Sequence, residues 1–234
     1  MKALILFDFD GTLADTAPDL AAAANRQRER RGLAPLPEAR LRPFASQGAR
    51  GLLRAALDML PDHPDFLATR QQFLDDYEAA MTCRTQLFPG IPELLQRLQA
   101  QGLRWGIVTN KTERLALPLV RHLGLAEACA VTVCGDTTAH AKPHPEPLLH
   151  AARLAGFAPH DCLYVGDDRR DVQAARAAAM PVVAAAYGYC GDGEDVAAWQ
   201  ADRYAHSPGE LWDAIRSLLT HRAARAELSG TAPD

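Results

Sequence analysis

Short apolar runs recur along the chain, each followed by polar residues, and they predict the strands of a buried sheet. Helical patterns alternate with these runs, which lie near residues 3–8, 104–109, 130–134, 162–166 and 181–186. Continuous apolar strands are typical of parallel sheets, because helices cover both faces of such sheets. We therefore expect an α/β fold with a Rossmann-like parallel sheet as its core.

A long segment that favours helices separates the first two predicted strands. It is rich in Ala, Leu, Arg and Glu and carries few strand signals. Thr16 stands where its first helix is expected to begin, and a threonine at that position predicts a capping side chain. We expect an α-helical cap domain over residues 16–83, inserted into a core domain that comprises residues 1–15 and 84–234.

Two carboxylates directly follow the first predicted strand. Asp8 and Asp10 occupy alternate positions, and Gly11 follows them in a turn. Side chains alternate along an extended chain, so both carboxylates point the same way, and two like charges so close are costly without a cation. Mg²⁺ is held by one or two carboxylates together with phosphate oxygens. The pair predicts a magnesium site for a phosphorylated ligand, although an acidic strand end with a glycine turn explains this segment alone equally well.

Three later segments carry polar groups at or near predicted strand ends. A hydroxyl and an amide can bind a phosphate without adding negative charge, and an ammonium is a compact charge suited to a phosphate oxygen. Taken singly, each segment is also compatible with a capped turn or a solvated surface. The groups are those of Thr109 and Asn110, of Lys142, and of Asp167, Asp168 and Asp171.

Together and in this order, the four segments resemble the active-site motifs of the haloacid dehalogenase superfamily of phosphotransferases. The resemblance implies that Asp8 is the nucleophile, which takes the phosphoryl group as an aspartyl-phosphate. Asp10 would be the general acid that protonates the leaving oxygen and then the base that activates water. The phosphoryl oxygens would be held by Thr109, Asn110 and Lys142, and Lys142 would also offset the charge of the nucleophile.

The same resemblance implies a bound Mg²⁺ ion. Its ligands would be Asp8, Asp167 and the main-chain carbonyl of Asp10. Asp171 would orient a water on the metal without touching the metal, and Asp168 would at most support that arrangement. A carboxylate that attacks a phosphate dianion meets repulsion, so the metal and the lysine are both required.

The helical insert resembles the small caps of phosphoglycolate phosphatases and β-phosphoglucomutases within this superfamily. In its middle, residues 46–50 include Gly48 and Arg50, where such caps place a loop that contacts the substrate. The guanidinium of Arg50 could hold a substrate carboxylate in a bidentate pair, or it could be an ordinary exposed arginine. The resemblance implies hydrolysis of a small, carboxylate-bearing phosphorylated metabolite, with 2-phosphoglycolate as the first expectation.

A second substrate fits almost as well. Residues 166–171, 187–189 and 199–202 resemble a relative that acts on N-acetylmuramic acid 6-phosphate, whose lactyl group also bears a carboxylate. Tyr187 and Tyr189 could stack on such a sugar, but we favour packing roles for both.

Three weaker alternatives remain. A phosphomutase would need a tightly closing cap that excludes water, and a metal-independent dehalogenase would leave Asp10, Asp167 and Asp171 unexplained. A degenerate binding module should have lost part of the charged set, which is all present.

Composition and charge narrow the class of protein. The net charge of −4 and the lack of a basic cluster argue against a nucleic-acid partner. No run reaches the roughly 18 apolar residues of a membrane span, and the first apolar run breaks at Asp8, so we expect no signal peptide and a cytoplasmic monomer or homodimer. The five cysteines lack metal-ligand spacing. From His221 onward, the polar sequence predicts a frayed tail.

Overall fold

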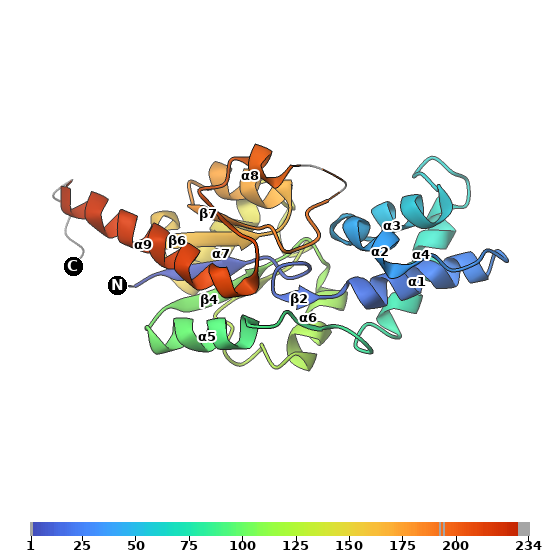
Figure 1. Ribbon diagram of the computed structural model, residues 1–234, viewed down its shortest axis with the longest axis horizontal. Helices are drawn as coiled ribbons and strands as arrows, with labels where there is room; N and C mark the ends of the chain where they lie inside the picture. Colours follow the sequence, from blue (N-terminus) through green and yellow to red (C-terminus); the bar gives the residue numbers. More distant parts are fainter. Residues whose placement is uncertain (1, 192, 194, 229–234) are drawn as a thin grey trace.

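The chain folds around a six-stranded parallel sheet (Figure 1). The computed structural model describes residues 2–191, 193 and 195–228. The strand order is β5-β4-β1-β6-β7-β8, so β1 pairs with β4 on one side and with β6 on the other. The strands are β1 (Leu4–Phe7), β4 (Arg104–Val108), β5 (Thr132–Val133), β6 (Cys162–Gly166), β7 (Val182–Ala185) and β8 (Arg203–Ala205). The predicted α/β fold with a parallel core is confirmed.

The sequence predicts five of these strands and misses β8. This strand pairs with β7 at the edge of the sheet. Only Ala205 is fully buried in it, while Arg203 and Tyr204 stay partly exposed. A partly exposed edge strand lacks the continuous apolar run that marks the inner strands in the sequence. Only its pairing with β7 in the folded structure therefore defines it.

Alternate residues of β1 face opposite sides of the sheet. Leu4 and Leu6 belong to one apolar cluster and Ile5 and Phe7 to the other, and all four are fully buried. The first cluster includes residues of α7 (Glu146–Ala155) and α8 (Arg169–Ala177), and the second includes residues of α5 (Ile91–Ala100), α6 (Glu113–His122) and α9 (Leu211–Leu228). Continuing the alternation places Asp8 on the side of α7 and α8.

The helical insert forms a separate layer beside the carboxyl ends of the strands, at the right of Figure 1. It consists of α1 (Ala17–Glu29), α2 (Glu38–Leu41), a 3-10 helix (Arg42–Gln47), α3 (Gly48–Leu57) and α4 (Phe66–Glu78). The chain enters it through β2 (Ala14–Asp15) and leaves it through β3 (Gln86–Leu87), and these two strands pair antiparallel. This layer is called the cap below, while its boundaries at residues 16 and 83 stay a prediction.

The start of α1 differs from the expected capping arrangement. Thr16 occupies the N-cap position, but its side chain makes no capping hydrogen bond. Its hydroxyl instead donates to the carboxylate of Asp10, and the phenolic oxygen of Tyr189 accepts hydrogen bonds from the N–H groups of Thr16 and Ala17 at 2.7 and 2.9 Å. The prediction of a Thr16 cap is wrong, because a residue distant in sequence supplies the acceptor.

The C-terminal segment also differs from expectation. α9 continues to Leu228, so the tail predicted from His221 is wrong for residues 221–228. Residues 229–234 lie outside the described part of the chain. Neither α9 nor another helix of the described residues has the length and apolar content needed to span a bilayer.

Two leucines of α7 test this packing. Leu148 is fully buried under the sheet and Leu154 is 59% exposed. We expect Leu148→Ala to lower the free energy of unfolding by about 2–5 kcal/mol, because it leaves a cavity. The matched Leu154→Ala variant should change it by less than about 0.5 kcal/mol. Urea denaturation measures both, and equal losses would contradict the orientation of α7.

Candidate active site

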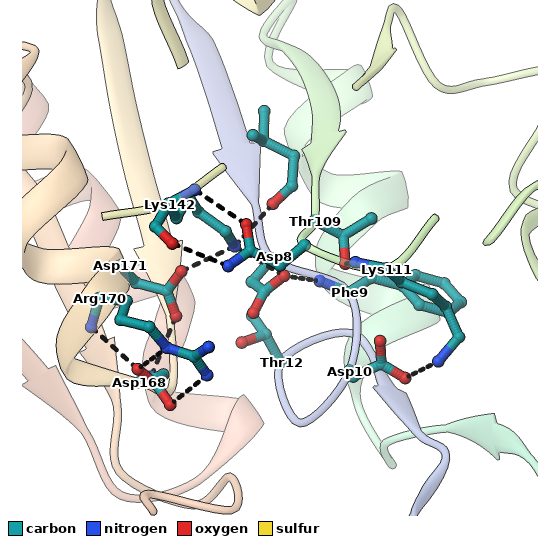
Figure 2. A network of polar contacts seen from close by, with 12 residues as sticks. Asp8, Phe9, Asp10, Thr12, Thr109, Lys111, Lys142, Asp168, Arg170 and Asp171 are labelled. Carbon is teal, nitrogen blue, oxygen red and sulfur yellow. Dashed lines mark hydrogen bonds and ion pairs between the residues drawn. The ribbon is translucent and has the colours of Figure 1, made fainter. Parts of the chain in front are cut away.

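Asp8 lies immediately beyond β1, at the carboxyl edge of the sheet (Figure 2). Its N–H donates to the carbonyl of Val165 at 2.8 Å, so the pairing of β1 with β6 extends to this residue. One carboxylate oxygen accepts a hydrogen bond from the N–H of Phe9 at 2.8 Å and lies 2.9 Å from the ammonium of Lys142. The carboxylate is thus held by the strand that carries it and by a distant cation.

The ammonium of Lys142 has four oxygen partners. Its Nζ lies 2.9 Å from Asp8, 2.8 Å from Asp171, 2.7 Å from the hydroxyl of Tyr164 and 2.9 Å from the carbonyl of Val108. The side chain is 2% exposed. Burial alone would lower the pKa of this lysine, but Asp171 and Asp8 outweigh it and hold the pKa above its ordinary value. Lys142 therefore remains a cation beside the predicted nucleophile.

Asn110 fixes the backbone that carries this lysine. Its amide nitrogen donates to the carbonyl of Lys142 at 2.9 Å, and its amide oxygen accepts from the N–H of Lys142 at 2.9 Å. The neighbouring Thr109 is 3% exposed, and its hydroxyl oxygen accepts from the N–H of Lys111 at 3.1 Å. The Asn110 side chain thus places the lysine, and direct contacts of Asn110 and Thr109 with a phosphate stay predictions.

Three carboxylates meet next to this lysine. Oxygens of Asp8, Asp167 and Asp171 all lie within 4.8 Å of one another. Burial raises the pKa of Asp8 to about 7, although Lys142 opposes the shift. Burial, and then the charges of Asp8 and Asp171, raise the pKa of Asp167 well above its ordinary value. A cation placed among these oxygens would offset both the burial and the mutual repulsion.

The backbone around Asp167 is packed so tightly that glycine is required. A Cβ on Gly11 or on Gly188 would clash with the Asp167 side chain, and Gly11 also has a positive φ of 82°. Asp167 accepts hydrogen bonds from the hydroxyl of Thr12 at 3.0 Å and from the N–H of Tyr189 at 2.8 Å. These contacts hold the carboxylate of Asp167 close to those of Asp8 and Asp171.

This donor set fits a divalent metal. Buried carboxylate oxygens are the ligands of hard divalent cations, and the structure groups Asp8 and Asp167 as predicted, together with Asp171. A metal bound there would supply positive charge to neutralise the nucleophile and the phosphate. The side chain of Asp10 lies outside the group, and the binding of its main-chain carbonyl to the metal stays a prediction.

Asp168 has a different place from the other acidic residues of its segment. It is the N-cap residue of α8, accepts hydrogen bonds from the backbone and side chain of Arg170 and pairs with that guanidinium at 2.8 Å. Arg170 also donates to the carbonyl of Ser46 in the cap at 2.7 Å. Asp168 therefore orients an arginine that links the core to the cap.

Lys111 and Tyr77 line the site, although the sequence predicts a role for neither. The ammonium of Lys111 lies 2.8 Å from the carboxylate of Asp10 and 4.9 Å from the centre of the Tyr77 ring. Lys111 follows Thr109 and Asn110 directly at the end of β4, and that adjacency is the one signal that could have identified it. No sequence signal connects Tyr77, a buried residue of α4, with this site.

A cavity of about 540 Å³ opens between the core and the cap. Arg50 and Gly48 line it, as the predicted substrate loop requires, and Arg50 is exposed. Other lining residues come from the ends of β1 and β4 and from α4, and they include Asp10, Thr109, Asn110, Lys111, Phe73 and Tyr77. The cavity thus joins the residues of the predicted phosphate site to those of the predicted specificity loop.

Tyr187 and Tyr189 have structural partners away from this cavity. The hydroxyl of Tyr187 donates to the carbonyl of Thr12 at 2.7 Å, and its ring meets Phe88 edge-on with centroids 5.3 Å apart. Tyr189 binds the start of α1 through its hydroxyl, and the guanidinium of Arg42 lies 5.2 Å from its ring centre. These contacts support the packing roles that we favour over sugar stacking.

Comparisons with known proteins identify the family. The model of haloacid dehalogenase-like hydrolases matches residues 5–185. The chain belongs to this family. It is 48% identical over 209 residues to phosphoglycolate phosphatase of Xanthomonas campestris pv. campestris, which covers 89% of this chain and 94% of the relative.

Two further relatives agree with this family. The chain is 42% identical over 215 residues to N-acetylmuramic acid 6-phosphate phosphatase of Pseudomonas aeruginosa, covering 92% of this chain and 95% of the relative. The crystal structure of a predicted phosphoglycolate phosphatase from Haemophilus somnus superposes with a TM-score of 0.80 at 28% identity, covering 91% and 97% of the two chains. The haloacid dehalogenase-like assignment thus rests on sequence and on fold.

The raised pKa of Asp8 predicts how stability changes with pH. In the metal-free protein, Asp8 binds more protons in the folded state than in the unfolded state between the ordinary pKa of 3.8 and about 7. The free energy of unfolding should therefore fall, through this group, as the pH rises across that interval. Asp8→Asn cannot titrate, so its stability should fall less over the same interval.

Urea denaturation in EDTA from pH 5 to pH 8 measures this difference. Adding Mg²⁺ at pH 8 should stabilise the native protein and restore part of the loss, because the ion binds the ionised carboxylates of the folded state. If the free energy of unfolding changed equally with pH in the wild type and in Asp8→Asn, the raised pKa of Asp8 would be contradicted.

Proposed function

We propose that this chain is a Mg²⁺-dependent phosphomonoesterase that forms an aspartyl-phosphate on Asp8. The observation that carries the proposal is the ammonium of Lys142, which bonds to both Asp8 and Asp171 within the buried acidic group. This lysine opposes the effect of burial on Asp8 and so favours an ionised carboxylate where a phosphate dianion must approach. The phosphatases among the relatives support the same chemistry.

The reaction divides into two displacements at phosphorus. In the first, a carboxylate oxygen of Asp8 forms a bond to phosphorus while the bond to the substrate oxygen breaks, and Asp10 gives that leaving oxygen a proton. In the second, Asp10 takes a proton from water, whose oxygen attacks phosphorus and releases Asp8 together with inorganic phosphate. Lys142 offsets negative charge on the nucleophile and on the phosphoryl oxygens in both steps.

The proposed substrate is 2-phosphoglycolate, a small ester with a carboxylate. The phosphoglycolate phosphatase of X. campestris supports it through its 48% identity. Arg50 lines the cavity and is exposed to it, so its guanidinium can pair with the substrate carboxylate. In this proposal Gly48 allows the backbone beside Arg50 to take a positive φ of 59°.

The size of the cavity favours a second candidate, N-acetylmuramic acid 6-phosphate. A volume of about 540 Å³ exceeds what a two-carbon acid needs and leaves room for a sugar. Phe73 and Tyr77 add aromatic surface to the wall. The P. aeruginosa relative acts on this sugar phosphate according to its name, and its identity of 42% is close to that of the first relative.

A cytoplasmic location stays a prediction under either substrate.

Removal of the nucleophile tests the reaction. Asp8→Asn keeps the shape of the side chain but cannot form the aspartyl-phosphate, so we expect the release of inorganic phosphate to fall by at least about 10³-fold. The exposed Asp62 supplies a control, and Asp62→Asn should retain the wild-type rate. EDTA should remove the activity of the wild type and excess Mg²⁺ should restore it. Full turnover of Asp8→Asn, or full turnover in EDTA, would contradict the proposal.

A substrate panel tests the role of Arg50. We expect Arg50→Met to lower kcat/KM about 10- to 100-fold for whichever carboxylated substrate is preferred, because a charged hydrogen bond is lost. The value for glucose 6-phosphate, which lacks a carboxylate, should fall less than about threefold on the same reasoning. Arg40 of α2 lies outside the cavity lining and supplies the control Arg40→Met.

The wild-type values of kcat/KM for 2-phosphoglycolate and N-acetylmuramic acid 6-phosphate decide between the two candidates. Equal losses on carboxylated and uncarboxylated substrates in Arg50→Met would show that Arg50 does not recognise the carboxylate.

A further inference from the structure

One ammonium connects the predicted general acid–base to the cap. Nζ of Lys111 lies 2.8 Å from Oδ1 of Asp10, and the side chains of this pair are 8% and 14% exposed. The ring of Tyr77, on α4 of the cap, covers the same ammonium with its centre 4.9 Å away. Lys111 itself follows β4 of the core, so the contact spans the two layers of the molecule.

Two side chains donate hydrogen bonds to the same carboxylate oxygen of Asp10. Lys111 and the hydroxyl of Thr16 both donate to Oδ1 of the carboxylate. A carboxylate fixed through one oxygen presents its other oxygen in a set direction, and proton transfer needs that direction to be right. In Figure 2 the second oxygen of Asp10 points away from Lys111. The contacts therefore leave Oδ2 to carry the proton.

The surroundings of Lys111 make it a stable cation. Burial alone would lower its pKa, but the carboxylate of Asp10 and the nearby Tyr77 outweigh the burial and hold the pKa above its ordinary value. An ion pair that is largely removed from water depends strongly on its geometry. Displacement of α4 would expose the ammonium to water and weaken its hold on the carboxylate.

We propose that Lys111 is a positioning residue for Asp10, and that the Tyr77 ring couples this positioning to the closure of the cap. The proposal rests on the proposed role of Asp10 as the general acid–base. Asp10 takes its working orientation while α4 lies against the core, so proton transfer is efficient only when the cavity is covered. Lys111 acts through Asp10 rather than on the phosphoryl group.

The ring of Tyr77 lies over the ammonium of Lys111, and the phenol hydroxyl acts on the same ammonium, so the two contributions need to be separated. Tyr77 is 1% exposed. A buried aromatic ring stabilises an adjacent cation through its face. Tyr77→Phe keeps the face and Tyr77→Leu removes it, so the two substitutions separate ring from hydroxyl.

The experiment compares substrates that differ in their need for an acid. An alkoxide must be protonated as it leaves, whereas 4-nitrophenolate leaves as a stabilised anion. The value of kcat/KM reports the step in which the leaving group departs. We expect Lys111→Met to lower kcat/KM about 10- to 100-fold for the best alkyl phosphate of the panel. For 4-nitrophenyl phosphate, the loss should stay below about threefold on the same grounds.

Conservative variants complete the comparison. Lys111→Arg keeps a cation and should lose less than Lys111→Met on the alkyl phosphate, and Tyr77→Phe should lose less than Tyr77→Leu. Thermal unfolding checks that each variant is folded. A lysine that binds the phosphoryl group would instead lower kcat/KM equally for both substrates, and that result would overturn the proposal.

Asp10→Asn separates this inference from the proposed function. If Asp10 is the acid–base, Asp10→Asn loses activity on the alkyl phosphate, and adding Lys111→Met should reduce it less than about twofold further, since the two residues act as one unit. Activity retained by Asp10→Asn would overturn the role of Asp10 itself. Loss in Asp10→Asn with full activity in Lys111→Met would overturn only the positioning role.

Discussion

The concentration of buried negative charge at the carboxyl edge of the sheet is the constraint on which this site depends. Burial and mutual repulsion raise the pKa of Asp8 and Asp167, and both effects oppose the ionised state that nucleophilic attack requires. Lys142 is the cation that the chain itself supplies against this cost, and it bonds to Asp8 and Asp171 together. Much of the surrounding structure serves to keep this lysine and these carboxylates in place.

The support for Lys142 illustrates this dependence. The side chain of Asn110, which follows the end of β4, makes two hydrogen bonds with the lysine backbone, while Tyr164 of β6 reaches the lysine ammonium. The strands β4 and β6 flank β1, and Asp8 directly follows the last residue of β1. The parallel order of three strands thus determines the distance between the nucleophile and its cation. A residue near the substrate can therefore be important because it positions another group, and Asn110 is an example.

Positioning also explains how the cap takes part. Arg170, oriented by Asp168, reaches the carbonyl of Ser46 on one side of the site, while Lys111 meets Tyr77 on the other. Arg170 directly precedes Asp171 and Lys111 directly follows Asn110, so both links begin beside predicted site residues. A movement of the cap would therefore change the surroundings of the chemistry without any change in the sheet, which is how a small helical insert can govern both access and reactivity.

The sequence by itself determined the parallel core and the acidic and basic residues at its strand ends, because apolar runs and the polar residues after them are local signals. It could not locate β8, the hydroxyl that caps α1 or the partners of Lys111. β8 is an edge strand, Tyr189 reaches Thr16 from the far end of the chain, and Tyr77 approaches from another layer. Each is a contact between segments distant in sequence, so only the tertiary structure decided it.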